Sequence, residues 1–413
     1  MTQPQPRDGR TVSHDDIKHR HLLELLPSRA RGGAEEYMLT VTKAAAVRGW
    51  RVSAAFPKCA GTASLIHDLV ETGVAFNPLE LVEPDDGQPA RGRVRRELTN
   101  VLKTMRVLRH ARPDVVHLVL PWPGLGLGSM VALALLRCPT VVTFQLVAGI
   151  YPVSPMRKRV YAWCRRRGQR WVAISENNHK LVCESFGVAA DEVAVIPNGA
   201  RLPDIMSAAA RESLRTDVRR ELGLAAGSRM LLTVGRLSDQ KGYALLIPVV
   251  AAVVREYPDV TFVWVGDGER RELFARMLTE HGGAAHVVMT GFRRDVRRLM
   301  QAADLFVFPT LFEGLPFTLL EAMATRLPIV ASDASSIPEV IQDGVHGVLF
   351  RMGEVGALES AILDSLRDPV RLGAMAGRAQ ERASLFSEAR MLEDTLAVLS
   401  SRADNEGLVG RSR

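Results

Sequence analysis

The feature that most constrains this chain is an alternation of short apolar runs with helix-length segments, which occurs in two successive sets. Runs rich in Val, Ile and Phe that are separated by helices are typical of parallel strands buried on both faces of a sheet. The first set comprises residues 22–28, 51–57, 114–120, 140–146, 171–176 and 193–199. The second set comprises residues 231–237, 261–268, 287–292, 305–310 and 328–333. The sequence therefore predicts an α/β protein with two doubly wound, Rossmann-like parallel sheets.

Changes of composition place the domain boundaries. The polar start of the chain predicts a disordered tail over residues 1–17, and the polar end predicts a second tail over residues 403–413. Between the tails we predict an N-terminal domain over residues 18–205 and a C-terminal domain over residues 206–385. Residues 386–402 are predicted to form a final helix that returns to the N-terminal domain. Ligands of such sheets bind beyond the carboxyl ends of the strands, which directs attention to the cleft between the domains.

The composition excludes several classes of protein. The four cysteines lie far apart without a CxxC pair, which indicates neither a disulfide framework nor a zinc site and suits a reducing compartment. No apolar run approaches the roughly 18–20 residues of a membrane-spanning helix. We therefore expect a soluble, cytoplasmic protein.

The charge favours an anionic partner, because the formal net charge is +7 and the isoelectric point is near 9.5. The basic residues concentrate in residues 91–112 and 157–170. In the first of these segments, apolar residues recur at helical spacing: Val94, Leu98, Val101, Met105 and Leu108. One interpretation is an amphipathic helix packed on a sheet with a solvated basic face, and the other is a peripheral contact with anionic lipid at the inner membrane face. Nucleic acid is not expected as a partner, because no binding module is present.

Cationic side chains follow the first strand of the second set. Gly235 ends that strand, and Arg236 and Lys241 lie on the turn before the next helix. Arg offers a planar fork of N–H groups to phosphate oxygens, and Lys offers a mobile point charge. Together they predict a diphosphate site, whereas two solvated cations at a helix start are the simpler interpretation. A glycine at a strand end, as at Gly291 before Phe292, lets a flat nucleobase approach the backbone.

Two carboxylates flank the apolar segment EGLPFTLLE, residues 313–321. A carboxylate buried without a partner is costly, so acids at both ends indicate ligands for them. Gly314 admits close approach, and free N–H groups at the start of the following helix suit an anionic or hydroxyl-rich ligand. One acid for a sugar and one for a ribose explains the spacing. The simpler alternative makes Glu313 a loop cap and Glu321 a surface residue.

The second half of the chain carries three motifs in order: VGRL with QKG, then TGF, then EGLPFTLLEAM. These motifs resemble those of the retaining GT-B glycosyltransferases of family four, the group 1 transferases. GGAEEY, PWPG, AISE and VIPNG in the first half match as well, and the resemblance covers nearly the whole chain between the tails. It implies the GT-B fold, with two Rossmann-like domains facing each other across a cleft. It also implies transfer of a sugar from a nucleoside-diphosphate sugar to an acceptor hydroxyl with retention of configuration, in the synthesis of surface polysaccharide, glycolipid or glycoconjugate.

The resemblance also implies roles for individual residues. Glu313, Arg236 and Lys241 correspond to the catalytic residues, with Glu313 on the transferred sugar and the two cations on the diphosphate. The residues corresponding to the sugar-nucleotide site are Gly33, Gly235, Gly291, Phe292, Gly314, Leu315, Phe317 and Glu321. Among these, Glu321 is expected to bind the ribose and the backbone near Phe292 the base. Neither a metal nor a cofactor is expected, and a UDP-sugar is the first expectation for the substrate.

The sequence departs from the family pattern at Gln145, where many members have a His near the reacting sugar. Gln donates and accepts hydrogen bonds but does not act as a general base at neutral pH, so we expect Gln145 to orient a hydroxyl of the sugar or the acceptor. Arg201 also replaces a residue that is commonly acidic. Two alternatives stay open: a non-catalytic protein that binds a nucleotide sugar, and a sugar-nucleotide epimerase of the same fold. A nicotinamide dehydrogenase is disfavoured, because VGDGERR keeps only the first two glycines of GxGxxG.

Overall fold

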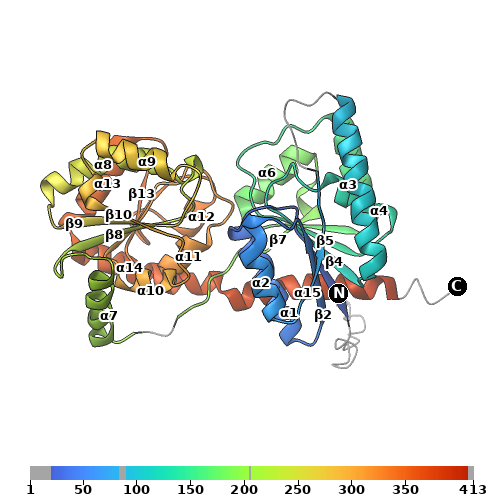
Figure 1. Cartoon of the computed structure of the whole chain (residues 1–413), viewed down its shortest axis with the longest axis horizontal. Helices are drawn as coiled ribbons and strands as arrows, with labels where there is room; N and C mark the ends of the chain where they lie inside the picture. The colour runs from blue at the N-terminus through green and yellow to red at the C-terminus, as the bar shows by residue number, and fades with distance from the viewer. Residues whose placement is uncertain (1–19, 83–89, 204–205, 408–413) are drawn as a thin grey trace, which may run out of the picture. The chain divides into compact units, whose positions relative to one another are not determined.

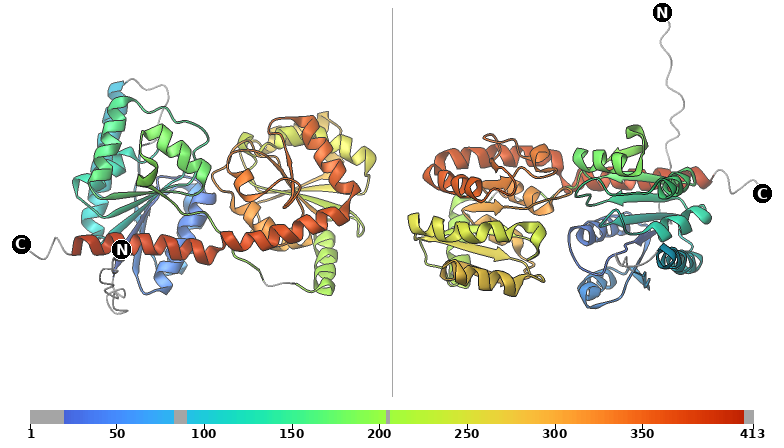
Figure 2. Two further views of the ribbon diagram at one scale, coloured as in Figure 1. Left: turned by 180° about the vertical axis from the view of Figure 1, so that it is seen from behind. Right: turned by 90° about the horizontal axis from the view of Figure 1, so that it is seen from above.

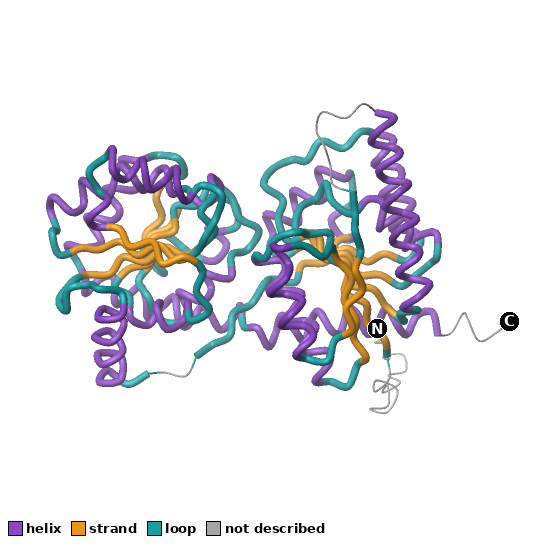
Figure 3. The backbone as a smooth tube through the Cα atoms, in the orientation of Figure 1, coloured by secondary structure: helices purple, strands orange, loops and turns teal. Residues whose placement is uncertain are grey.

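The computed structural model describes residues 20–82, 90–203 and 206–407 of the chain (Figure 1). The predicted tail over residues 1–17 lies outside the described residues, and so does the end of the second predicted tail. Within the described part the chain forms two sheets, and Figure 3 shows the strands of each sheet lying between helices. Each sheet is described separately below.

The first sheet has seven strands in the order β3-β2-β1-β4-β5-β6-β7. Its strands are β1 (His21–Leu25), β2 (Arg51–Phe56), β3 (Ala75–Pro78), β4 (Val115–Leu120), β5 (Thr140–Phe144), β6 (Gln169–Ala173) and β7 (Val193–Val195). The helices between them are α1 (Gly33–Val47), α2 (Ala63–Glu71), α3 (Ala90–Ala111), α4 (Leu127–Leu135), α5 (Pro155–Arg166) and α6 (Glu176–Phe186). Short 3₁₀ turns occur at Ala60–Thr62 and Ala190–Glu192. β1 lies between β2 and β4 and is buried along its whole length, as a central parallel strand must be.

The second sheet has six strands in the order β10-β9-β8-β11-β12-β13, and all neighbouring strands are parallel. Its strands are β8 (Arg229–Val234), β9 (Val260–Val265), β10 (Val287–Gly291), β11 (Leu305–Phe308), β12 (Ile329–Ser332) and β13 (Val348–Phe350). Its helices are α7 (Ala208–Glu221), α8 (Tyr243–Glu256), α9 (Arg271–Glu280), α10 (Val296–Ala302), α11 (Phe317–Ala324), α12 (Ile337–Val340), α13 (Val355–Arg367) and α14 (Pro369–Ala383). Turns of 3₁₀ helix occur at Asp239–Lys241, Ala284–His286 and Ser384–Phe386. The prediction of two doubly wound parallel sheets is therefore confirmed.

Contacts divide the chain into two compact units. Of the described residues, the first unit takes those up to Thr143, Pro155–Trp171 and those from Thr395 onward. The second unit takes Phe144–Ser154 and Val172–Asp394. Figure 2 shows in further views that helices cover both faces of each sheet.

The final helix, α15, runs over Glu388–Gly407 and so extends beyond the predicted range of 386–402. Its second half belongs to the first unit, where polar contacts hold it. Thr395 Oγ1 lies 3.3 Å from the hydroxyl of Tyr37 on α1, and both side chains are buried. The guanidinium of Arg20 donates to the carbonyl oxygen of Ser400 at 3.2 Å. These contacts tie α15 to α1 and to Arg20, the residue directly before β1.

The basic helix α3 buries only part of the apolar pattern expected for it. Val101 and Leu108 are buried, whereas Val94 is 60% exposed and Leu98 is 59% exposed. The packed face of the first interpretation of this helix therefore does not include Val94 and Leu98. They lie on the outer side of the helix.

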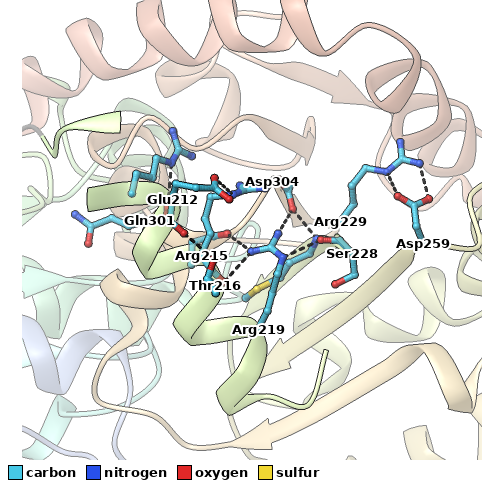
Figure 4. Close-up of polar contacts among 12 residues, drawn as sticks. Glu212, Arg215, Thr216, Arg219, Ser228, Arg229, Asp259, Gln301 and Asp304 are labelled. Carbon is cyan, nitrogen blue, oxygen red and sulfur yellow. Dashed lines mark hydrogen bonds and ion pairs between the residues drawn. The ribbon is translucent and has the colours of Figure 1, made fainter. Parts of the chain in front are cut away.

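A buried charge network fixes α7 to the amino ends of the second sheet (Figure 4). The Arg219 side chain is nearly inaccessible, and its guanidinium donates to Asp304 at 2.7 Å. The same guanidinium donates to the backbone carbonyl oxygens of Arg215, Ser228 and Ala302. Asp304 also accepts from the side chain of Arg215 and from the backbone N–H of Met230 at the start of β8. Burial lowers the pKa of Arg219, and the nearby Asp304 carboxylate opposes that change.

Removing Asp304 is expected to destabilise the second unit, because Arg219 would keep its buried charge without a counter-ion. We expect Asp304→Ala to lower the free energy of unfolding by about 3 kcal/mol, measured by urea titration. The matched control is Asp217→Ala on α7, since Asp217 pairs with Arg220 at an exposed site. That change should cost at most about 0.5 kcal/mol. Equal losses in the two variants would contradict this account of the network.

Candidate functional site

The residues predicted to bind the ligand lie mostly at one edge of the second sheet. Gly291 is the last residue of β10, Gly235 follows β8, and the segment before Glu313 follows β11. Because the strands are parallel, their carboxyl ends meet at the same edge. From β10 to β11 this edge spans three strand spacings, roughly 14 Å. An edge of that width matches an extended ligand better than a compact one.

Three glycines make a close-packed floor at this edge. Gly266, directly after β9, has φ of +135°, and a Cβ there would lie 2.1 Å from the carbonyl oxygen of Gly235. Its N–H donates to the carbonyl oxygen of Gly291 at 2.9 Å. Gly266 therefore brings the ends of β8 and β10 together, and no residue with a side chain fits there. Gly266 is not among the residues predicted from the sequence for this site, although the VGDG segment contains the signal.

Lys241 and Glu313, which are far apart in the sequence, form an ion pair at this edge. Lys241 Nζ lies 2.5 Å from Glu313 Oε1, and the side chains are 18% and 8% exposed. The hydroxyl of Thr310 donates to the same oxygen at 2.8 Å. The Lys241 ammonium also lies 5.5 Å from the ring centroid of Phe308, within the range of a cation–π contact. Glu313 is therefore a buried carboxylate with a cation and a hydroxyl bound to it.

Backbone hydrogen bonds join the two loops that carry this pair. The backbone carbonyl oxygen of Gln240 accepts from the N–H of Leu311 at 2.8 Å. The side-chain amide of Gln240 donates to the carbonyl oxygen of Phe312 at 2.9 Å. Gly242, next to Lys241, has φ of +70°, and a Cβ there would lie within 1.8 Å of the carbonyl oxygen of Pro309. These contacts fix the backbone on both sides of Lys241 beside the loop that carries Glu313.

The segment between the two glutamates forms a buried turn and a helix start. Leu315 is 3% exposed, and α11 begins at Phe317, directly after Pro316. The first N–H groups of a helix have no partner within the helix, so this start can donate to a ligand. Glu321 is the fifth residue of α11 and is half-buried.

Gln145 contacts the same segment within the second unit. Its side-chain oxygen accepts from the amide of Asn198 at 3.3 Å, and Asn198 also donates to the carbonyl oxygen of Leu315 at 3.0 Å. A Cβ at Gly314 would lie 1.9 Å from the carbonyl oxygen of Gln145, so only glycine fits there. Asn198 thus connects Gln145 to the Glu313 loop. The sequence analysis quoted the VIPNG segment but gave Asn198 no role.

The other predicted residues are more exposed or lie elsewhere. Arg236 is exposed directly after Gly235, and Phe292 is 64% exposed directly after Gly291. Both lie at the edge described above, just beyond the ends of β8 and β10 respectively. Gly33 is the first residue of α1 in the first unit.

Two family comparisons together cover most of the chain. Residues 31–202 match the family described as Glycosyltransferase Family 4, and residues 228–368 match Glycosyl transferases group 1. The chain is a glycosyltransferase with the GT-B fold.

Similar proteins agree with this assignment. The glycosyltransferase is 26% identical over 285 residues to the UDP-Gal:alpha-D-GlcNAc-diphosphoundecaprenol alpha-1,3-galactosyltransferase of Escherichia coli, covering 67% of this chain and 72% of that protein. It is 29% identical over 350 residues to the phosphatidyl-myo-inositol mannosyltransferase of Mycobacterium tuberculosis, covering 81% and 83%. The structure of Anabaena HepE in complex with UDP-glucose superposes with a TM-score of 0.76 at 24% identity, covering 92% of this chain and 99% of that one. The last likeness concerns the fold alone.

None of the helices described for this glycosyltransferase is long and apolar enough to cross a membrane. No group of three or more His, Cys, Asp or Glu side chains in the described part of the chain is arranged to hold a metal ion.

Gly242 is expected to hold the Lys241–Glu313 pair in place. Gly242→Ala forces a Cβ against a backbone carbonyl at positive φ, so the free energy of unfolding should fall by about 1–3 kcal/mol. Urea titration measures the loss. The matched control is Gly373→Ala on α14, where a Cβ meets open space. That change should be neutral or stabilising by up to about 1 kcal/mol. A Gly242→Ala protein as stable as the Gly373→Ala protein would refute the steric argument.

Proposed function

We propose that this glycosyltransferase transfers a sugar from a UDP-sugar to a hydroxyl of a lipid-linked acceptor, with retention of the anomeric configuration. The observation that carries the proposal is the ion pair of Lys241 with the buried Glu313, beside the glycine floor of the second sheet. At this edge the Lys241 cation can bind a diphosphate, and the neighbouring Glu313 carboxylate can accept hydrogen bonds from sugar hydroxyls.

The parts of the sugar nucleotide are assigned along this edge. The base lies against the backbone at Gly291 and Phe292, and the ribose hydroxyls bind Glu321. The diphosphate binds Arg236 and Lys241, whose charges stabilise the departing nucleotide without a metal ion. The sugar hydroxyls bind Glu313 and the N–H groups of the turn that precedes α11.

The proposed reaction needs no side chain as a base. The bond between the anomeric carbon and the phosphate oxygen breaks, and the acceptor oxygen attaches on the same face of the sugar. The acceptor proton passes to the departing phosphate oxygen. Gln145, held by Asn198, orients a hydroxyl of the sugar or the acceptor and takes no proton.

The similar proteins support the choice of substrates. The Escherichia coli relative is named for UDP-Gal and a diphosphoundecaprenol acceptor, and the Mycobacterium tuberculosis relative for phosphatidyl-myo-inositol. The Anabaena structure holds UDP-glucose. Lipid-linked acceptors of this kind belong to the synthesis of surface polysaccharides and glycolipids. With such an acceptor, we propose that the reaction takes place at the cytoplasmic face of the membrane.

Nucleotide binding tests the proposal. A ligand that binds only the folded state raises its stability, by about 2.7 kcal/mol at a hundred times its dissociation constant. We expect UDP to raise the melting temperature and GDP and ADP to raise it less. The shift should disappear in Glu321→Ala and persist in the matched control Glu359→Ala, another half-buried helix carboxylate of the second unit. The absence of a shift with any nucleotide, or equal loss in both variants, would contradict the site.

Slow hydrolysis of the UDP-sugar separates a catalyst from a protein that only binds. Lys241→Ala should lose hydrolysis because the leaving diphosphate loses a cation. Gln145→Ala should keep UDP binding and lose turnover. Wild-type rates in Gln145→Ala would refute its orienting role, and binding without hydrolysis or transfer would favour the non-catalytic alternative.

A further inference from the structure

Helix α3 presents apolar side chains to solvent along one side. Val94, Leu98 and Leu102 are 60%, 59% and 68% exposed. Their spacing of four residues places them on one face of the helix. Figure 1 shows α3 beside α4 in the first unit.

Arginines share this exposed face. The exposed arginines of the stripe are Arg91, Arg95, Arg106 and Arg109. With about 100° of rotation per residue, these four and the three apolar residues fall within a single stripe. The stripe, which we call the α3 stripe, is about 27 Å long from its first to its last arginine. Its composition is apolar and cationic at once.

Polar contacts on the inner side hold α3 in this orientation. The amide of Asn100 donates to the carbonyl oxygen of Val82 and accepts from its N–H, at 3.0 and 2.8 Å. The hydroxyl of Thr104 lies 3.0 Å from that of Ser129 on α4. Both inner side chains are buried, so the helix cannot rotate to hide the apolar part of the stripe.

The stripe contains no acid that would neutralise its arginines. The single carboxylate in residues 91–112 is Glu97, which faces inward. It accepts from the N–H of Gly128 at 2.9 Å and pairs with Arg96 at 2.8 Å. A partner of the α3 stripe must therefore be anionic and must also receive three apolar side chains.

We infer that the α3 stripe docks on the surface of an anionic lipid bilayer. Such a surface meets both requirements. Its lipid phosphates pair with the arginines, and Val94, Leu98 and Leu102 enter the boundary between headgroups and acyl chains. A second copy of the chain would place arginines against arginines. Nucleic acid would leave the apolar residues without a partner.

A hollow at the end of α3 extends the same surface. Its volume is about 460 Å³, and it is lined by Leu108, Arg109, Arg112, Pro113, Leu136 and Cys138. Arg109 belongs both to the hollow and to the α3 stripe. Two arginines over an apolar wall suit a lipid phosphate with the beginning of its acyl chains.

This inference deepens the proposed function, and it rests on that function for the lipid-linked acceptor. The experiment itself needs neither donor nor acceptor. The full-length protein is sedimented with vesicles of phosphatidylcholine, with or without phosphatidylglycerol. Binding should require phosphatidylglycerol and should weaken strongly as salt rises to ~0.5 M.

Two pairs of substitutions test the stripe. The double variant Arg95→Glu, Arg106→Glu should bind anionic vesicles at least about tenfold more weakly. Each basic residue near such a surface raises the affinity for it about fivefold. Leu98→Ser with Leu102→Ser should also weaken it, because both side chains would leave water on binding. All four positions are exposed, so the variants should fold as the wild type does.

Matched controls change the same properties in the second unit. Arg255→Glu with Arg276→Glu makes the same change of net charge at exposed positions of α8 and α9. Val370→Ser removes an apolar side chain that is 82% exposed on α14. Both controls should bind vesicles within about twofold of the wild type.

Several outcomes would overturn the inference. These are no binding to either vesicle, equal binding to both, or equal losses in the arginine variants and their controls. Dimers in solution that dissociate in the Leu98→Ser, Leu102→Ser variant, without vesicle binding, would assign the stripe to a second copy. UDP binding measured without vesicles should be the same in all these variants, so failure of the stripe and failure of the proposed function are distinguishable.

Discussion

The candidate site depends on one ion pair, between Lys241 and Glu313. A buried carboxylate without a partner is costly, and removing one member of a buried pair leaves the other uncompensated. The fold meets this constraint by fastening the loops after β8 and β11 to each other through Gln240 and Gly242. The pair is therefore held by contacts within the chain itself. A site prepared in this way loses little conformational entropy when a diphosphate arrives.

The sequence predicted the fold to a large extent, because a strand buried on both faces must be apolar along its whole length. All eleven predicted runs overlap strands, and the two strands that were missed are β3 and β13. Both lie at the edge of a sheet. β3 is exposed or half-buried and ends at Pro78, so it lacks the apolar run that identifies a central strand.

The candidate site was predictable in its residue types and not in its contacts. The motifs placed a glycine, an arginine and a lysine after one strand and two glutamates after another, and parallel strands bring such ends to one edge. Nothing in the spacing showed that Lys241 would bind Glu313 or that Asn198 would hold Gln145. Such contacts depend on how loops that are distant in the sequence meet in the fold. For α3, the periodicity identified the helix, but which of its sides faces solvent depends on the elements that pack against it.

The proposed function depends most on the binding of the sugar nucleotide's diphosphate at the carboxyl edge of the second sheet. A crystal structure with a bound UDP-sugar tests it most directly. Phosphate oxygens are expected within hydrogen-bonding distance of Arg236 and Lys241, with the ribose at Glu321. A UDP-sugar bound with its phosphates on other residues, and Lys241 still paired only with Glu313, would contradict it.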